Sequence, residues 1–260
     1  MAAMKKFKKQ SVPYLIMHNT RGYGDKKPGN EEIDFNRTKD NYYLTPESHG
    51  RTQQEIKKYY RDTIGQYYQY GSTRLVTAVE WICTAPTSLS EDQRREFFKA
   101  TYDFLNSLYG EQNCFSAIVH KDEKVFDYRG KKVAGEDHLH YSFIPAVQVT
   151  DKNPKHKVSK YEYKVCADKL FKKKDLLNFH PLYQKYLDDQ LSFKAIVHKS
   201  EVGKSYMHNY QTVQHLKDQT KIDLARDRIR ELEQTIERSH ERDHIWGESG
   251  NWGSSSWGIK

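Results

Sequence analysis

The chain has 260 residues, of which 36% are hydrophobic and 13% aromatic, enough to build one main folded domain with an extension. The three cysteines, Cys83, Cys114 and Cys166, are odd in number and widely spaced, which excludes a disulfide framework and favours a cytoplasmic protein. Residues 1–17 contain only a short apolar run without a signal-peptide core, so we expect no membrane insertion.

The charge balance points to a polyanionic partner. Lys and Arg number 43 against 35 Asp and Glu, which leaves a formal net charge of +8. Basic side chains gain affinity for nucleic acid by releasing condensed counterions, so DNA or RNA is the leading candidate. A merely soluble basic surface is the alternative.

The chain order of predicted elements indicates an α+β fold. Helical spacing of apolar residues and a Ser90 cap predict helices at residues 47–71, 88–110 and 175–191. Shorter apolar runs predict strands at residues 11–18, 41–44, 73–86, 113–120, 137–149 and 192–198. Because several strands are hairpin neighbours, we expect an antiparallel sheet with helices packed on one face.

Three further regions follow the predicted hairpin. Residues 151–175 mix lysines with Tyr and Phe, a composition that suits phosphate contacts and stacking on unpaired bases as well as it suits a solvated loop. Residues 211–243 are polar and helical, with an apolar seam from Ile222 to Ile236 that predicts a coiled coil and self-association. The Gly/Ser-rich tail, residues 244–260, carries spaced tryptophans and is interpreted as a flexible partner-docking segment. The main domain then covers residues 1–210.

Three histidines form the candidate site. In a strand, alternate residues share a face, so His138 and His140 project from the same side. His120 ends the preceding predicted strand, with Asp122 and Glu123 directly after it. If these strands pair antiparallel, three imidazoles meet on one surface. That arrangement predicts a catalytic divalent metal site with open positions.

Several motifs together resemble the HUH endonucleases, and in particular the Mob/Pre family of plasmid mobilisation relaxases (MobV-type). The His-x-His pair carries the first likeness. The others are "HNTR" at 18–21, "NYYLTP" at 41–46, "VEWICTAP" at 79–86 and "VHKDE" at 119–123, which occur in the order of that family's motifs. The likeness covers roughly residues 4–215. One departure is the insertion "KVFDYRGKKVAGED", interpreted as an extended hairpin, which leaves open whether Glu123, Asp122 or Asp137 supports the metal.

The resemblance implies an HUH relaxase fold and a relaxase function. Such an enzyme nicks and rejoins one DNA strand at a transfer origin through a covalent 5′-phosphate adduct. It further implies His18 as the nucleophile, with Arg21 neutralising phosphate charge and Glu80 orienting His18. The metal would be held by His120, His138 and His140, with Glu123 or Asp122. Mn²⁺ is expected first, then Mg²⁺, Co²⁺ or Zn²⁺.

The sequence leaves other functions open. A tyrosine of the stretch at residues 58–70 is the alternative nucleophile, although packing is the commoner role for tyrosines on a helix. The alternatives to a relaxase are a replication initiator or transposase of the same chemistry, a non-catalytic origin-binding protein, and a small-substrate metallohydrolase. The expected partners are single-stranded or supercoiled origin DNA, a second copy of the chain, and a secretion or coupling protein bound through the tail.

Overall fold

The computed structural model describes residues 2–24, 33–126, 132–197 and 228–230. By internal contacts the chain divides into two units, residues 1–125 with 133–208, and residues 126–132 with 209–260. The first contains all of the site below. The predicted seam from Ile222 to Ile236 and the Gly/Ser-rich tail lie outside the described residues, apart from an exposed helical stretch at 228–230. The predicted domain boundaries stay predictions.

A five-stranded antiparallel sheet forms the centre of the first unit, in the order β1-β3-β7-β4-β2. A second small sheet pairs β8 with β9, and a third pairs β5 with β6, which lie within the insertion noted in the sequence. The strands are β1 (Ala2–Lys8), β2 (Tyr42–Tyr43), β3 (Val76–Thr84), β4 (Cys114–His120), β5 (Lys124–Phe126), β6 (Lys132–Ala134), β7 (His138–Phe143), β8 (Ala146–Gln148) and β9 (Tyr163–Val165).

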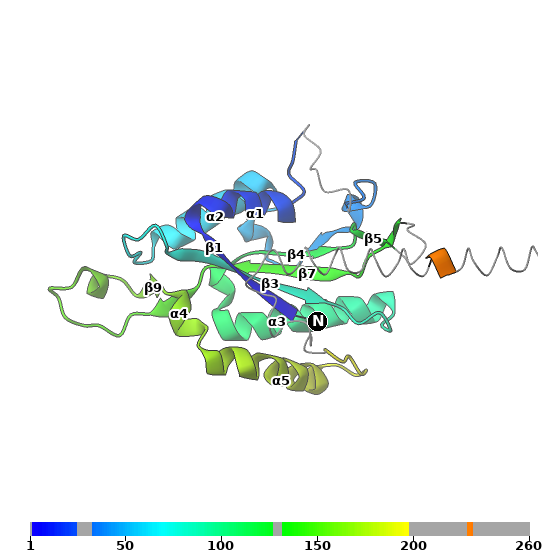
Figure 1. Cartoon of the computed structure of the whole chain (residues 1–260). Coiled ribbons are helices and arrows are strands. Elements are labelled where there is room, and N and C mark those ends of the chain that lie inside the picture. The colour runs from blue at the N-terminus through cyan, green and yellow to red at the C-terminus, as the bar shows by residue number, and fades with distance from the viewer. Residues whose placement is uncertain (1, 25–32, 127–131, 198–227, 231–260) are drawn as a thin grey trace, which may run out of the picture. The chain divides into compact units, whose positions relative to one another are not determined.

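Helices cover both faces of this sheet (Figure 1). They are α1 (Val12–Asn19), α2 (Gln53–Gly65), α3 (Glu91–Tyr109), α4 (Ala167–Leu170) and α5 (Lys173–Gln190), with short 3₁₀ turns η1 (Lys9–Ser11), η2 (Thr38–Asp40), η3 (Glu47–His49), η4 (Glu111–Asn113) and η5 (Lys157–Lys160). One apolar core lies between the sheet and α3 with α5, where Trp81 stacks on Phe179 with ring centroids 3.7 Å apart. The other lies between the sheet and α1 with α2. The α+β antiparallel fold is confirmed, but the expectation of helices on one face only is wrong.

The first predicted strand, residues 11–18, is wrong. It is helix α1, and the first strand is β1, which precedes it. A short apolar run cannot be told from a buried helix segment by composition alone. The deciding signals are Pro13 in the first turn of the helix and the buried stripe of Val12, Leu15, Ile16 and Asn19, whose spacing of three and four residues is helical.

Other elements also differ from their predicted bounds. Helix α2 ends at Gly65 and not at Gly71. The run at residues 137–149 is split at Pro145 into β7 and β8, because proline cannot donate to a ladder. Residues 192–197 form no strand in the described part of the chain. By contrast, α3 begins as predicted with a Ser90 cap, whose side chain accepts a hydrogen bond from the Gln93 amide, and ends before Gly110.

Candidate functional site

The candidate site lies on the face of the sheet that α1 covers. Glu80 on β3 pairs with Ser142 on β7, and His120 on β4 lies directly opposite His138 on β7. Alternation sends Trp81, Tyr141 and their neighbours into the opposite core, so the polar residues share one face. A register shift between Cys114 and Ser116 adds an irregularity to β4 and moves Cys114 to the other face, contrary to the parity expected from sequence.

The structure brings the three predicted ligand histidines together. The ring centroids of His120 and His140 lie 4.4 Å apart, those of His138 and His140 5.0 Å, and those of His120 and His138 5.5 Å. His138 donates its Nδ1–H to the Glu136 carbonyl at 2.9 Å, and its Nε2 lies 3.5 Å from a Glu123 oxygen. These three side chains thus meet, because β4 and β7 pair directly in the sheet although the insertion separates them in the sequence.

Glu80 fixes the orientation of His140. The buried Glu80 carboxylate accepts the His140 Nδ1–H at 2.9 Å, an Asn19 amide hydrogen at 2.8 Å and the Ser142 hydroxyl at 3.2 Å. Burial raises the pKa of Glu80, against the opposing effect of the Asn19 hydrogen bond. Burial and the neighbouring His138 lower the pKa of His140, so its ring is neutral. Its Nε2 is buried and has no hydrogen-bond partner among the described residues, which is the expected state of a metal-ligating nitrogen.

His18 lies at the end of α1, above the sheet. Its ring centroid is 5.5 Å from that of His140 and 6.0 Å from that of His120. Nδ1 lies 3.1 Å from the Tyr23 hydroxyl oxygen and Nε2 lies 3.5 Å from Arg21 Nη1. Because a guanidinium only donates, Nε2 is the unprotonated nitrogen and Nδ1 donates its hydrogen to Tyr23. Burial and the Arg21 charge lower the pKa of His18, which keeps the ring neutral with its Nε2 lone pair directed at Arg21.

Arg21 anchors the loop after α1 to the end of β4. Its side chain is buried, and Nε and Nη2 donate to the two oxygens of Asp122 at 3.0 and 2.7 Å. Nη2 also donates to His120 Nδ1 at 3.0 Å and to Glu123 at 2.9 Å. The backbone of Arg21 has φ of +54°, an unfavourable region for a residue with a Cβ, so these contacts hold a strained conformation.

The three candidate carboxylates occupy different places. Asp122 is fully buried against Arg21 and accepts a further hydrogen bond from Thr38 at 2.9 Å. Burial alone would raise its pKa, but the hydrogen bonds and charge of Arg21 outweigh burial and lower it. Asp137 pairs with Arg94 at 3.0 Å. Glu123 is the carboxylate that contacts both Arg21 and His138.

One donor atom from each of His18, His120, Glu123 and His140 lies within 4.8 Å of the others. His138 is not in this group, although its Nε2 adjoins Glu123. The unpartnered His140 Nε2 and a donor set of imidazoles with one carboxylate fit a divalent transition metal. The Arg21 guanidinium donates to two of these donors, His120 Nδ1 and Glu123, and burial together with its charge lowers the pKa of His120.

Sequence reasoning missed two residues of this site, Asn19 and Tyr23. Asn19 bridges Glu80 and Ser142 with its side chain and accepts the His120 Nε2–H on its backbone carbonyl at 2.8 Å. Tyr23 orients His18, whereas no hydrogen bond joins Glu80 to His18 among the described residues. The helical stripe that ends at Asn19 would have identified Asn19. No sequence pattern places Tyr23, because its position depends on the turn at Arg21.

Three tyrosines of the stretch at residues 58–70, two on α2 and one beyond its end, serve in packing. Tyr60 is buried and meets Phe115 edge to face at 5.0 Å, and burial raises its pKa. Tyr59 stacks on His49 at 4.0 Å. Tyr67 donates to Asn113 at 2.7 Å. The Tyr60 and Tyr67 hydroxyl groups are buried, and the Tyr59 hydroxyl donates to the Gln112 carbonyl at 3.1 Å.

Similarity to known proteins identifies the family of this chain. Residues 1–199 match the family described as plasmid recombination enzyme. The chain belongs to that family. Curated members of the plasmid recombination enzyme family include one from Bacillus thuringiensis, 26% identical over 179 residues, and a type 1 enzyme from Staphylococcus aureus, 28% identical over 142 residues. The matched parts cover 67% and 50% of this chain and 34% and 30% of those relatives, so the chain spans about a third of their length.

Solved structures with the same fold are relaxase domains. A Mn-bound crystal structure of the MobM relaxase domain with plasmid pMV158 oriT DNA at pH 5.5 has a TM-score of 0.57 and 22% identity, covering 82% of this chain and 95% of that one. Another, at pH 6.8, has a TM-score of 0.56 and 23% identity, covering 76% and 89%. This plasmid recombination enzyme family member therefore has the relaxase-domain fold. No helix in its described residues is long and apolar enough to cross a membrane.

Proposed function

We propose that this chain is a metal-dependent DNA relaxase that nicks and rejoins one strand at a transfer origin, with His18 as the nucleophile. The observation that carries this proposal is the state of His18. Its ring is neutral, Tyr23 takes the Nδ1–H, and the Nε2 lone pair faces the charged group of Arg21 beside the histidine cluster. A phenol with a pKa near 10 would need a base to reach the same reactivity.

The chemistry follows from these positions. His18 Nε2 attacks the scissile phosphorus, a P–N bond forms to the 5′ phosphate, and the bond to the 3′ oxygen breaks. That oxygen takes a proton from solvent and leaves as a free 3′-OH. Because the energy of the phosphate bond is retained in the adduct, the 3′-OH can attack it in reverse and rejoin the strand. Tyr23 holds the imidazole on its Nδ1 side throughout.

Arg21 and the histidine cluster act on the phosphate. Arg21 Nη1 lies 3.5 Å from the attacking nitrogen, where it can neutralise charge on the phosphate oxygens. His120, His138 and His140, with Glu123, would hold the metal, Mn²⁺ first among candidates. Glu80 and Asn19 keep His140 and His120 in their tautomers. When bound, a divalent metal supplies Lewis-acid polarisation of a non-bridging phosphate oxygen.

Nicking of supercoiled plasmid that carries the native origin tests the proposal. The full-length chain should open the plasmid with Mn²⁺ and not with a chelator, and His18→Ala should abolish opening while it still binds DNA. Cutting at a replication origin instead would identify a replication initiator, and binding without nicking would identify an origin-binding protein. Calorimetry tests the ligands separately, since His138→Ala/His140→Ala should lose Mn²⁺ binding. Parent-like Mn²⁺ binding by this variant would remove the ligand assignment.

We also propose self-association through the apolar seam from Ile222 to Ile236, and docking of a coupling protein on the Trp-containing tail. The periodicity of the seam in the sequence supports the first, and the spacing of tryptophans supports the second. Light scattering should detect a dimer that Ile229→Asp dissociates. A monomer at high concentration, unchanged by this substitution, would show that the seam does not mediate self-association.

A further inference from the structure

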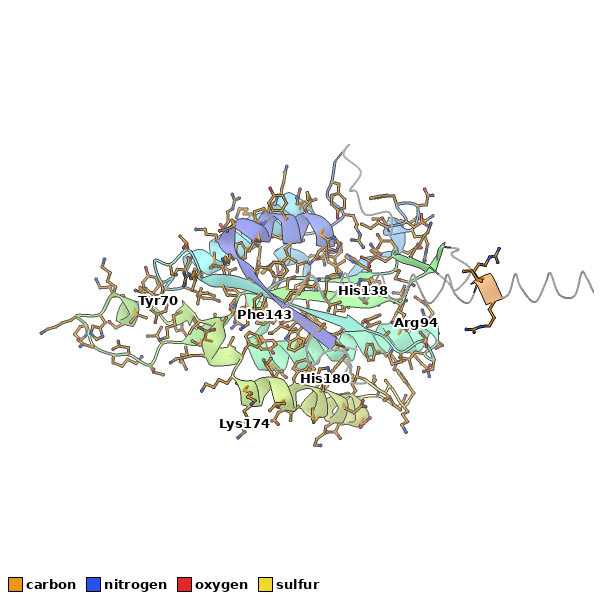
Figure 2. All side chains as sticks on the ribbon, viewed as in Figure 1. Tyr70, Arg94, His138, Phe143, Lys174 and His180 are labelled. Atoms are coloured by element: carbon orange, nitrogen blue, oxygen red, sulfur yellow. The ribbon has the colours of Figure 1, made fainter. Side chains whose placement is uncertain are left out.

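A tyrosine cluster with a lysine-rich border lies away from the histidine site. The ring of Tyr68 contacts Tyr70 at 5.0 Å and Tyr161 at 5.6 Å between centroids. Tyr70 and Tyr161 remain 43% and 39% exposed, unusually open for packed aromatic rings. Figure 2 shows Tyr70 beyond the Phe143 end of β7, whereas His138 begins that strand, so the cluster lies toward the opposite end of β7 from the histidine site.

The border of this cluster is strongly basic. Residues 151–175 contain nine lysines and four carboxylates, a net charge of +5 out of +8 for the whole chain. Lys155, Lys157 and Lys160 are exposed, and no carboxylate lies within ion-pair distance of them among the described residues. Exposed Lys99 is paired with Asp103 at 2.5 Å, whereas Lys155, Lys157 and Lys160 have no such pair in the described part of the chain. The unpaired lysines therefore present uncompensated charge beside exposed rings.

The loop that carries these lysines is internally hydrogen-bonded. Asp151 accepts from His156 at 2.7 Å and from the Asn153 amide at 2.9 Å, and Asn153 accepts from the Lys155 amide at 3.0 Å. Turn η5 follows, and the Tyr161 amide bonds the Val158 carbonyl at 3.1 Å. At the other side, the Tyr68 amide donates to the Tyr163 carbonyl at 2.9 Å. Local bonds thus fix Tyr161 beside Tyr68 before any partner arrives.

We propose that Tyr68, Tyr70 and Tyr161, with Lys155, Lys157 and Lys160, form a binding surface for single-stranded DNA separate from the histidine site. Exposed rings stack on unpaired bases of any sequence, and unpaired lysines contact the phosphates between them. Duplex DNA hides its base faces, so these exposed rings favour a single strand over a duplex. The surface would hold a DNA segment at a distance from the scissile phosphate. This proposal rests on the proposed function, in which DNA is the substrate. The surface itself takes no part in the chemistry.

Fluorescence anisotropy of a labelled (dT)₃₀ strand in chelator-containing buffer tests this surface without any nicking. Tyr70→Ala/Tyr161→Ala should weaken binding about tenfold or more, since stacking contributes on that scale for each base. Tyr70→Phe/Tyr161→Phe keeps the rings and should bind within twofold of the parent. Equal binding by the alanine and parent proteins, with both fully folded by thermal unfolding, would overturn the proposal.

The lysines are tested by the salt dependence of the same binding. Lys155→Ala/Lys157→Ala/Lys160→Ala should lower the slope of log affinity against log salt by about 2, because each single-strand phosphate contact contributes roughly 0.7. The matched control replaces Lys58, Lys99 and Lys185, which are each paired with an aspartate, and removes the same net charge. Equal slopes for the two triple variants would show that Lys155, Lys157 and Lys160 do not contact the DNA phosphates.

A duplex of the same length separates stacking from general charge attraction. If the tyrosine-to-alanine variant weakens duplex binding as much as single-strand binding, the rings do not stack on bases and the proposal fails. Every arm measures binding in chelator-containing buffer, and none requires nicking. A protein that never nicks DNA can therefore still pass or fail this test, which keeps the outcome distinct from that of the proposed function.

Discussion

Replacing Arg21 by methionine tests the buried ion pair that ties α1 to β4. The side chains of Arg21 and Asp122 are 2% and 0% exposed, and two hydrogen bonds of 3.0 and 2.7 Å join them. Methionine preserves much of the aliphatic stem but leaves the buried Asp122 carboxylate with the Thr38 hydroxyl as its main remaining side-chain donor. Leaving a buried charge unpaired costs about 3–5 kcal/mol. For a chain of this size that corresponds to a Tm lower by roughly 6–20 °C.

The pH dependence of this loss has a defined sign. Asp122 has a lowered pKa in the folded protein, so its contribution to stability is present above about pH 4, the pKa of an unfolded aspartate. That contribution disappears as pH falls through the lower, folded pKa. In Arg21→Met, burial raises the pKa of Asp122, so the variant relieves its penalty by protonation at a higher pH than the parent. The difference between the two proteins should be largest near pH 7 and shrink below pH 5.

Urea unfolding in chelator-containing buffer at several pH values measures this difference. Asp122→Asn in the Arg21→Met background should recover at least 1 kcal/mol, because the buried group is then neutral. A loss below 1 kcal/mol at pH 7, or no recovery with asparagine, would show that the pair does not carry the stability assigned to it.

Two further predictions concern orientation of the histidines. Glu80→Gln should weaken Mn²⁺ binding about tenfold or more in calorimetry, because the amide no longer supports the His140 ring with a charge, while Ser142→Ala should change it less than threefold; equal effects of both would contradict the role of Glu80. Tyr23→Phe should slow adduct formation about fivefold and leave oligonucleotide affinity unchanged, since one neutral hydrogen bond to His18 Nδ1 is lost; parent-like adduct formation would remove Tyr23 from the site.

The sequence predicted the sheet face of the site better than its helical side. Strand alternation was sufficient to place His138 and His140 together, and antiparallel pairing brought His120 opposite them. The position of His18 came from motif resemblance, whereas its local structure was predicted as a strand and is a helix. The contacts of Tyr23 and Asp122 depend on the positive φ of Arg21, which no periodic pattern encodes. The positions of Tyr23 and Asp122 therefore depend on tertiary contacts between α1 and β4, which the motifs alone did not predict.

The chemical nature of the protein–DNA adduct tests the central claim most directly. A labelled single-stranded origin oligonucleotide would be cleaved, the covalent complex trapped, and the attached peptide identified. We predict a P–N bond on His18 that is lost in acid and is absent from His18→Ala, because the ring of His18 is neutral and its Nε2 lies beside the Arg21 guanidinium. An acid-stable adduct on a tyrosine peptide, Tyr23 included, would contradict the account.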